Sequence, residues 1–381
     1  MSNPFYDTLR FGILGGGQLG RMLLQKAADY NVTNSVLDPD PEAPCRYLAD
    51  EFVCGSFQDY ETVLNFGRTV DLLTIEIEHV NVEALEQLEK EGIQVFPQAK
   101  VIRLVQDKGL QKIFYRTNGI PTAEFQLLDS LEHIEKYASQ FPFIQKLRKG
   151  GYDGKGVVRL ENSGEISKGF DAPSILEKLV TFEKEISVLV ARNRHGECAA
   201  FPAVEMEFNA EANLVEYLFS PATIKPEQET KAIEIALNVA RSIQVVGLLA
   251  VEMFLTRSGE ILVNEIAPRP HNSGHQTIEG NSTSQYEQHL RAILGLPLGS
   301  TQMIRPCVMV NLLGEKGYTG HAVYEGLEDA LAVSGVHLHL YGKKITRPFR
   351  KMGHVTVTAD TLEAAKEKAS KIKNMIRVMA S

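Results

Sequence analysis

The chain has 381 residues, more than one hydrophobic core usually supports, so two or three domains are expected. Hydrophobic residues make up 44% and charged residues 23%, an ordinary globular balance, and the net charge of −8 disfavours a general nucleic-acid binder. No apolar run is long enough to span a bilayer, no signal-peptide pattern opens the chain, and the four cysteines lack paired metal spacing. We therefore expect a cytoplasmic protein with no membrane or nucleic-acid partner.

Residues 1–106 alternate between strand patterns and helix patterns. "LRFGILGGGQLGRMLLQKAADY" begins as a strand, turns through three glycines and enters a helix with an apolar stripe. "NSVLDPD" and "VDLLTIEIEHV" are two further strands, and "NVEALEQLEKEG" is a helix that Asn81 opens. This alternation predicts an open, parallel, Rossmann-like α/β domain.

Residues 107–300 have a different pattern, which favours antiparallel strands. "FPFIQKLRKGGYDGKGVVRL" is two strands around a glycine-rich loop, and a β-hairpin turns at residues 257–259. Between them lies an amphipathic helix, with one side formed by Ala232, Ile233, Ala236, Val239, Ala240 and Ile243. Residues 301–381 contain short strands and two helices, and they predict a small C-terminal domain.

The first glycine turn can be interpreted in two ways. Gly15, Gly17 and Gly20 have the spacing of a dinucleotide-binding turn, and Asp38 is the candidate ribose ligand about twenty residues later. The alternative is a turn whose glycines only allow tight packing of strand against helix.

A second glycine-rich stretch, "KLRKGGYDGKG" at residues 146–156, combines four glycines with four cations in an acidic protein. Such a loop favours phosphate, because backbone amides and lysines neutralise its oxygens. The alternative is a polar hairpin turn.

Two glutamates stand on the arms of the predicted hairpin, Glu252 before its turn and Glu265 after it. Strands that pair through this turn bring both carboxylates to the same end of the ribbon, where a cation is needed to keep both charged. Mg²⁺ is the expected ion, and Asn264 is a possible third oxygen donor. The alternative is a pair of solvated glutamates.

The stretch "YGKKITRPFRKMGH" contains five cations and no acid: Lys343, Lys344, Arg347, Arg350 and Lys351. It is either a solvated basic face or a site for a phosphate monoester, which Arg can bind with two hydrogen bonds.

In their order along the chain, these stretches resemble the ATP-grasp enzymes, and most closely the N5-carboxyaminoimidazole ribonucleotide synthetase family. The resemblance runs from Gly15 to Thr356 and is carried by "GGGQLGRML", "EIEHV", "QDKGLQK", "GGYDGKG", "EKLVTFEKEISV", "NEIAPRPHNSGH" and "YGKKITRPFRKMGHVT". It implies an ATP-grasp fold in which a small lobe, residues 107–180, and a large lobe, residues 181–300, hold ATP. It also implies a homodimer.

The resemblance implies the following nucleotide site. Glu252 and Glu265 would bind Mg²⁺, Glu185 the ribose hydroxyls, and the segment from Glu177 to Val180 the adenine. The residues implied in ATP binding are Lys108, Lys146, Gly151, Tyr152, Asp153, Gly154, Lys155, Gly156, Val157, Glu177, Lys178, Leu179, Val180, Glu185, Asn264 and Glu265.

The implied reaction is the ATP- and bicarbonate-dependent carboxylation of 5-aminoimidazole ribonucleotide, through carboxyphosphate, in purine biosynthesis. The residues implied in binding the ribonucleotide are Gln18, Leu19, Glu76, Asn272, Lys343 and Arg350. The residues implied in catalysis are Tyr152, Asp153, Lys155, Arg269, His271 and Asn272.

Two rival functions remain. A sister ATP-grasp enzyme formylates glycinamide ribonucleotide with formate, but that family typically has Asp where Asn272 stands. A nicotinamide-dependent dehydrogenase would use the first glycine turn and leave the glutamate hairpin without a role. ADP release with bicarbonate or with formate, and an absorbance change with NADH, distinguish the three.

Overall fold

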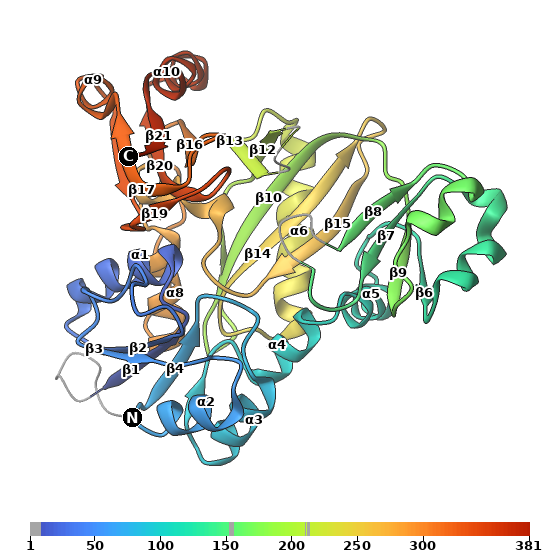
Figure 1. Cartoon of the computed structure of the whole chain (residues 1–381), viewed down its shortest axis with the longest axis horizontal. Coiled ribbons are helices and arrows are strands. Elements are labelled where there is room, and N and C mark those ends of the chain that lie inside the picture. Colours follow the sequence, from blue (N-terminus) through green and yellow to red (C-terminus); the bar gives the residue numbers. More distant parts are fainter. Residues whose placement is uncertain (1–8, 152–155, 210, 212–213) are drawn as a thin grey trace.

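A five-stranded parallel sheet forms the N-terminal part of the chain, as the alternating pattern predicted. The computed structural model describes residues 9–151, 156–209, 211 and 214–381 (Figure 1). The strand order is β3-β2-β1-β4-β5, with every pair parallel. The elements are β1 (Arg10–Leu14), α1 (Gln18–Ala27), β2 (Thr33–Asp38), β3 (Glu51–Cys54), α2 (Tyr60–Gly67), β4 (Leu72–Ile75), α3 (Val82–Lys90) and β5 (Gln94–Val95).

A smaller antiparallel sheet follows two connecting helices and lies at the right-hand end of the molecule in Figure 1. Its strand order is β6-β9-β7-β8, and the second glycine-rich stretch joins β7 to β8. This part contains α4 (Ala99–Val105), α5 (Lys108–Thr117), β6 (Phe125–Leu128), the 3-10 helix η3 (Leu131–Gln140), β7 (Phe143–Leu147), β8 (Val157–Leu160), the 3-10 helix η4 (Ser163–Lys168) and β9 (Ser174–Lys178).

A large antiparallel sheet occupies the centre, and α6 covers one of its faces (Figure 1). The strand path is β15-β14-β10-β12-β13-β16-β20-β18, with β11 paired to β10. The central elements are β10 (Phe182–Arg192), β11 (Cys198–Ala200), β12 (Val204–Asn209), β13 (Leu214–Ser220), α6 (Pro226–Ile243), β14 (Gly247–Thr256) and β15 (Ile261–Ala267). The predicted apolar side of α6 was wrong at one position, because Ile235 is buried where Ile233 was expected and Ile233 is only partly buried.

The C-terminal strands extend this central sheet, because β16 pairs with β13 and β20 pairs with β16. A three-stranded sheet of order β19-β17-β21 lies beside them. The remaining elements are the 3-10 helix η5 (Asn272–Gly274), α7 (Thr277–Gly280), α8 (Gln285–Leu294), β16 (Cys307–Leu313), β17 (Gly320–Glu325), α9 (Leu327–Leu331), β18 (Val336–Leu340), β19 (Ile345–Thr346), β20 (Lys351–Thr358), α10 (Leu362–Met375) and β21 (Arg377–Ala380).

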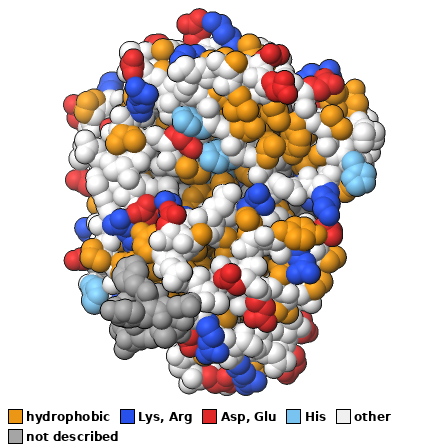
Figure 2. Space-filling model, turned by 90° about the vertical axis from the view of Figure 1, so that its left-hand side faces the viewer, with side chains coloured by type: hydrophobic (Ala, Val, Ile, Leu, Met, Phe, Trp, Pro, Cys, Tyr) orange, Lys and Arg blue, Asp and Glu red, His pale blue; other side chains and the backbone are white. Residues whose placement is uncertain are grey.

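The N-terminal and C-terminal parts lie against each other on one side of the central sheet (Figure 1). Their shared core contains Leu19 and Met22 from α1, Tyr286 and Leu290 from α8, and Tyr341. Figure 2 shows this side of the molecule, where basic and acidic side chains are scattered over the surface. Within the described part of the chain, no helix is both long and apolar enough to cross a membrane.

Candidate active site

The hairpin of β14 and β15 places two carboxylates side by side, as the sequence predicted. Glu252 and Glu265 are direct partners in the antiparallel register, so their side chains share one face of the sheet. Burial, followed by the charge of Glu265, raises the pKa of Glu252, whereas Lys108 lowers the pKa of Glu265. The two carboxylates therefore do not both ionise without another positive charge, which is the electrostatic requirement that a divalent cation meets.

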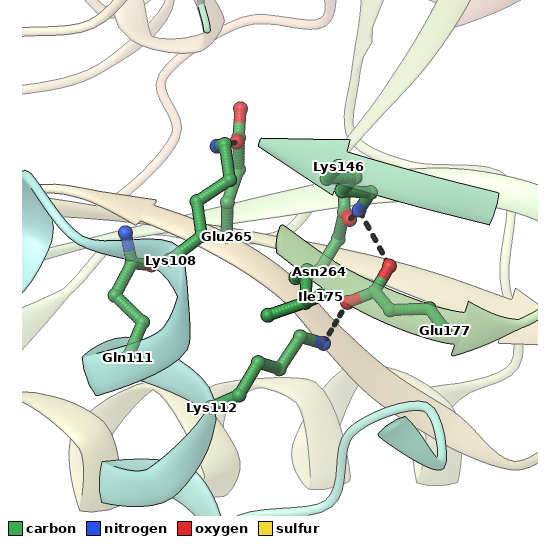
Figure 3. Close-up of a pocket in the computed structure, with 8 residues that line it drawn as sticks. All are labelled: Lys108, Gln111, Lys112, Lys146, Ile175, Glu177, Asn264 and Glu265. Atoms are coloured by element: carbon green, nitrogen blue, oxygen red, sulfur yellow. Dashed lines mark hydrogen bonds and ion pairs between the residues drawn. The ribbon is translucent and has the colours of Figure 1, made fainter. Parts of the chain in front are cut away.

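Two lysines supply positive charge beside this pair. Lys108, at the start of α5, lies 2.9 Å from Glu265 (Nζ to Oε2). Lys146, on β7, donates to Asn264 Oδ1 at 3.0 Å, so the oxygen proposed as a third metal ligand already accepts a hydrogen bond. In Figure 3 these side chains point into one pocket from α5, β7 and β15.

A buried carboxylate, Glu177, lies between Lys112 and Lys146 (Figure 3). Its two oxygens are 2.6 Å from Lys112 Nζ and 2.7 Å from Lys146 Nζ. Burial alone would raise the pKa of Glu177, but the two lysines outweigh it and hold the pKa at about 2. The Glu177 carboxylate is thus occupied by its ion pairs with Lys112 and Lys146. The predicted adenine contact of residues 177–180 would therefore have to come from their backbone.

Sequence reasoning missed Lys112, although a signal for it was present. Lys112 follows Lys108 by four residues on α5, a spacing that puts both on one face of a helix. Its side chain is 3% exposed, an unusual burial for a lysine, and its ammonium group also donates to Thr122 Oγ1 at 2.5 Å. Lys112 therefore lines the pocket and holds the Glu177 carboxylate through a buried ion pair.

The other predicted ATP ligands lie on the strands β8, β9 and β10 and the connections beside them, or outside the described residues. Burial raises the pKa of Glu185, on β10, to about 7, although Lys146 opposes the shift. Lys178 ends β9, and Leu179 and Val180 connect β9 to β10 between the two sheets. Gly151 follows β7, Gly156 precedes β8, and Val157 begins it, whereas Tyr152, Asp153, Gly154 and Lys155 lie outside the described residues.

The loop after the hairpin carries the predicted catalytic residues toward the two glutamates. His271 Nε2 lies 3.5 Å from Glu252 Oε1, and Arg269 pairs with Glu78 at 2.9 Å. Both polar side-chain atoms of Asn272 are buried without a hydrogen-bond partner among the described residues. Such atoms are costly unless a ligand or water satisfies them, so Asn272 is placed to meet a polar ligand.

Burial, followed by Arg269, lowers the pKa of His271 to about 3, so the ring is neutral at neutral pH. The Ser273 amide donates to His271 Nδ1 at 3.3 Å, which assigns the ring proton to Nε2, the nitrogen that faces Glu252. Gln285 holds the loop from α8, because it accepts from the His271 amide and donates to the His271 carbonyl, both at 2.8 Å. Glu78 and Gln285 are two further residues that the sequence analysis did not assign.

The first glycine turn is filled by carboxylates of the chain itself. Asp38 accepts from the Gly16 amide at 2.6 Å, and Glu76 accepts from the amides of Gly17 and Gly20 at 3.0 and 2.8 Å. Gly17 has no room for a side chain, because a Cβ there would collide with the Glu76 carboxylate. The amides that a dinucleotide would need are occupied, so this turn does not support the dehydrogenase interpretation.

The predicted ribonucleotide site lies where this turn meets the basic stretch. Lys343 Nζ donates to the Lys351 carbonyl at 2.8 Å, and Arg350 donates to the Ile345 carbonyl at 2.6 Å. Burial, followed by Arg350, lowers the pKa of Lys343 to about 8. These cations are therefore crowded together rather than spread over a solvated face.

Contacts from the N-terminal part reach this basic stretch. Lys344 pairs with Glu42, and Glu76 is close enough to Lys343 to influence its pKa. Gln18 begins α1 at the same turn, but the Leu19 side chain is 8% exposed and belongs to the core, which leaves only its backbone for a ligand.

Three family models match the chain. They are the Ribonucleotide synthetase preATP-grasp domain over residues 9–106, the ATP-grasp domain over residues 113–286, and the Phosphoribosylaminoimidazole carboxylase C-terminal domain over residues 307–368. These matches confirm the predicted ATP-grasp fold with a parallel N-terminal sheet domain and a small C-terminal domain.

Two curated proteins illustrate the similarity. Phosphoribosylaminoimidazole carboxylase, chloroplastic, from Vigna aconitifolia is 40% identical over 93% of this chain, which spans 64% of that protein. N5-carboxyaminoimidazole ribonucleotide synthase from Bacillus subtilis is 35% identical, with 92% of each chain covered.

Solved structures of enzymes from the same family are also similar to this chain. N5-carboxyaminoimidazole ribonucleotide synthetase from Thermotoga maritima superposes with a TM-score of 0.91 at 44% identity, covering 98% of this chain and all of that one. The Aspergillus clavatus enzyme in complex with ADP and 5-aminoimidazole ribonucleotide gives 0.89 at 34% identity, covering 97% and 98%. With the paired glutamates and the lysine pocket in place, this chain belongs to the N5-carboxyaminoimidazole ribonucleotide synthetase family of ATP-grasp enzymes.

Proposed function

We propose that the chain carboxylates 5-aminoimidazole ribonucleotide with ATP and bicarbonate, forming N5-carboxyaminoimidazole ribonucleotide, ADP and phosphate in purine biosynthesis. The observation that carries the proposal is the cross-strand pair of Glu252 and Glu265 beside Lys108 and Lys146. Carboxylates that need a cation, next to lysines that can meet phosphate oxygens, form a site for transfer of the γ-phosphoryl group.

Glu252 and Glu265 are the residues that would hold Mg²⁺. The donor set fits a partly hydrated ion, because it offers two carboxylates and leaves the other positions to phosphate oxygens and water. When bound, Mg²⁺ neutralises charge on the β- and γ-phosphates. Lys108 and Lys146 would contribute further charge, and Glu185 would accept from the ribose hydroxyls by family likeness.

In the first step a bicarbonate oxygen attacks the γ-phosphorus, the bond to the β-phosphate oxygen breaks, and ADP leaves. The product, carboxyphosphate, splits into CO₂ and phosphate. The amine nitrogen of the ribonucleotide then forms a bond to the CO₂ carbon and loses a proton. The protein contributes mainly by positioning and by charge neutralisation, and it must exclude water because carboxyphosphate hydrolyses.

The ribonucleotide would bind between the first glycine turn and the basic stretch. Lys343 and Arg350 would bind its phosphate, with Gln18, Glu76 and the backbone of Leu19 near its base. Asn272, whose buried amide has no hydrogen-bond partner among the described residues, would contact the substrates where they meet.

The neutral ring of His271 presents Nε2–H toward Glu252, which suits hydrogen-bond donation to an oxygen of carboxyphosphate. Arg269 would lie at the same junction. Tyr152, Asp153 and Lys155 complete the proposed catalytic set by family likeness, as part of the loop over the phosphates. Homodimeric assembly and a cytoplasmic location are proposed on the same likeness.

Product analysis tests the proposal. Purified protein is incubated with ATP, Mg²⁺ and bicarbonate, with and without 5-aminoimidazole ribonucleotide, and ADP and the carboxylated product are measured. We expect ADP release to depend on the ribonucleotide and to match the product formed. Release that depends instead on formate and glycinamide ribonucleotide would overturn the assignment in favour of the sister enzyme.

A further inference from the structure

Three histidine rings form a column between the loop after the hairpin and the C-terminal strands. The rings of His275 and His354 stack with centroids 4.5 Å apart, and His354 stacks on His339 at 4.4 Å. His275 and His354 are fully buried, whereas His339 is partly exposed and lies 2.7 Å from Glu279 (Nε2 to Oε1). None of these residues has a role in the reaction proposed above.

A tyrosine hydroxyl contacts one nitrogen of each buried ring. Tyr286 Oη lies 3.0 Å from His275 Nδ1, and Tyr341 Oη lies 3.0 Å from His354 Nδ1. Burial lowers the pKa of both histidines well below the ordinary value, so both rings are neutral at neutral pH. A neutral imidazole has one donor and one acceptor nitrogen, so the tyrosine contact specifies the orientation of each ring.

The residues that surround the column, which we call the seam, are polar. Thr356 lies on the same face of β20 as His354, and Gln276 and Glu279 follow His275 along the chain into α7. Five buried atoms there have no hydrogen-bond partner among the described residues: His275 Nε2, Gln276 Oε1, Glu279 Oε2, His354 Nε2 and Thr356 Oγ1. Apolar residues of similar volume would fill the seam at lower cost, so its composition favours a geometric role over bulk packing.

One end of the column reaches the loop that carries the proposed reacting residues. His275 Nδ1 lies 3.3 Å from Gln285 Nε2, and the same Gln285 side chain binds the backbone of His271 at both its amide and its carbonyl. A shift of His275 would therefore move the side chain that holds His271, with Asn272 next to it.

The other end of the column reaches the proposed phosphate site. His354 and Lys351 lie on β20, and the Lys351 carbonyl accepts from Lys343 Nζ at 2.8 Å. Tyr341, the partner of His354, precedes Lys343 by two residues, and the Lys343 ammonium lies 5.6 Å from the Tyr341 ring centroid. The position of Lys343 therefore depends on the strand and the ring that support His354.

We propose that His275 and His354 are positioning residues. They hold the loop of His271 and Asn272 at a fixed position relative to the phosphate site of Lys343. The stacked pair transmits the position of a bound ribonucleotide phosphate to the loop, so that ATP cleavage is coupled to the presence of the acceptor. This inference rests on the proposed function, because it takes the two ends of the column to be parts of one active site.

The test compares His354→Phe with Tyr341→Phe and with a control, His337→Phe. His354→Phe keeps an aromatic ring but removes the nitrogen that Tyr341 contacts, whereas Tyr341→Phe removes only the hydroxyl group. His337 lies on β18, next to the same strand, and is exposed. For each full-length protein we would measure the KM for 5-aminoimidazole ribonucleotide, the KM for ATP, the ratio of ADP to carboxylated product, and the melting temperature.

For His354→Phe we expect a rise of about fivefold or more in the KM for the ribonucleotide, a ratio of ADP to product above that of the wild type, and a KM for ATP within about twofold of the wild-type value. Tyr341→Phe should shift the same quantities in the same direction, and His337→Phe should shift none of them. A purely structural role would lower the melting temperature and leave the KM for the ribonucleotide and the ratio unchanged.

Wild-type values of that KM and ratio in both His354→Phe and Tyr341→Phe would overturn the assignment. If His354→Phe is not recovered as folded protein, Tyr341→Phe decides by itself. A wild-type protein that forms no carboxylated product would overturn the proposed function, and this inference with it, so the two failures are distinguishable.

Discussion

Glu252 and Glu265 face each other directly across β14 and β15, yet they differ in charge environment. Lys108 contacts Glu265 at 2.9 Å, while Glu252 faces the neutral ring of His271 at 3.5 Å. One carboxylate of the pair is thus already neutralised by a lysine and the other is not. Lys108 therefore lowers the pKa of Glu265, whereas burial, followed by the charge of Glu265, raises the pKa of Glu252.

We predict that Glu265→Gln abolishes ADP formation without unfolding the protein, because it removes a charge that Mg²⁺ and Lys108 both require. In the wild type, Mg²⁺ with ADP should raise the melting temperature, and this increase should shrink in the variant. Glu260→Gln, in the hairpin turn of the same sheet, is the matched control. Turnover of Glu265→Gln at the wild-type rate would contradict the metal assignment.

The Mg²⁺-free protein should lose stability as the pH rises through the range from about 4.5 to about 8. The pKa of Glu252 is raised to about 8, from 4.5, so the folded state keeps a proton that the unfolded state has lost. Where the folded state binds more protons, stability falls with rising pH. Glu252→Gln should make this fall shallower, as scanning calorimetry at several pH values would show, and identical slopes would count against the raised pKa.

Removal of Lys112 should damage the pocket that it lines together with Glu177 and Lys146. Lys112→Met leaves the buried Glu177 with Lys146 as its one remaining lysine partner among the described residues, and breaking a buried pair typically costs about 3 kcal/mol. We expect a lower melting temperature and a higher KM for ATP, with a normal KM for the ribonucleotide. Lys168→Met, on the exposed surface of the same small sheet region, is the control. An unchanged KM for ATP would limit Lys112 to stability alone.

Lys343→Ala or Arg350→Ala should weaken binding of the ribonucleotide by about 2 kcal/mol, roughly a factor of 30, because each removes a charge-assisted contact to phosphate. Calorimetric titration should show ATP binding close to the wild-type value. Lys344→Ala is a matched control, because Lys344 pairs with Glu42 at the surface instead. A loss of ATP affinity in the first two variants would assign the basic stretch to another site.

Much of the fold could be predicted because its signals are local. Counting residues from the turn at residues 257–259 was enough to bring Glu252 and Glu265 to the same end of the hairpin. It would have paired Glu252 with Asn264, and only the β-bulge between Glu252 and Met253 makes Glu265 its direct partner. The apolar stripe of α6 was predicted except for the exchange of Ile233 and Ile235, since a helical period drawn on sequence does not specify where the sheet contacts the helix. The assignment of single residues to ATP or the ribonucleotide rests on family likeness and remains a prediction.

By itself, then, the sequence determined the elements, the position of both glutamates at the same end of the hairpin, and the order of stretches that identifies the family. The tertiary structure decided which partners meet across long separations: Asp38 with Gly16, 22 residues apart, Glu76 with Gly17, 59 apart, and the pairs Lys112–Glu177 and His275–His354. The glycine turn shows the physical reason. A glycine turn has the same sequence pattern whether its backbone amides bind a ligand or a carboxylate of the chain itself. Only the packing of β2 and β4 beside β1 brings the carboxylates of Asp38 and Glu76 to these amides.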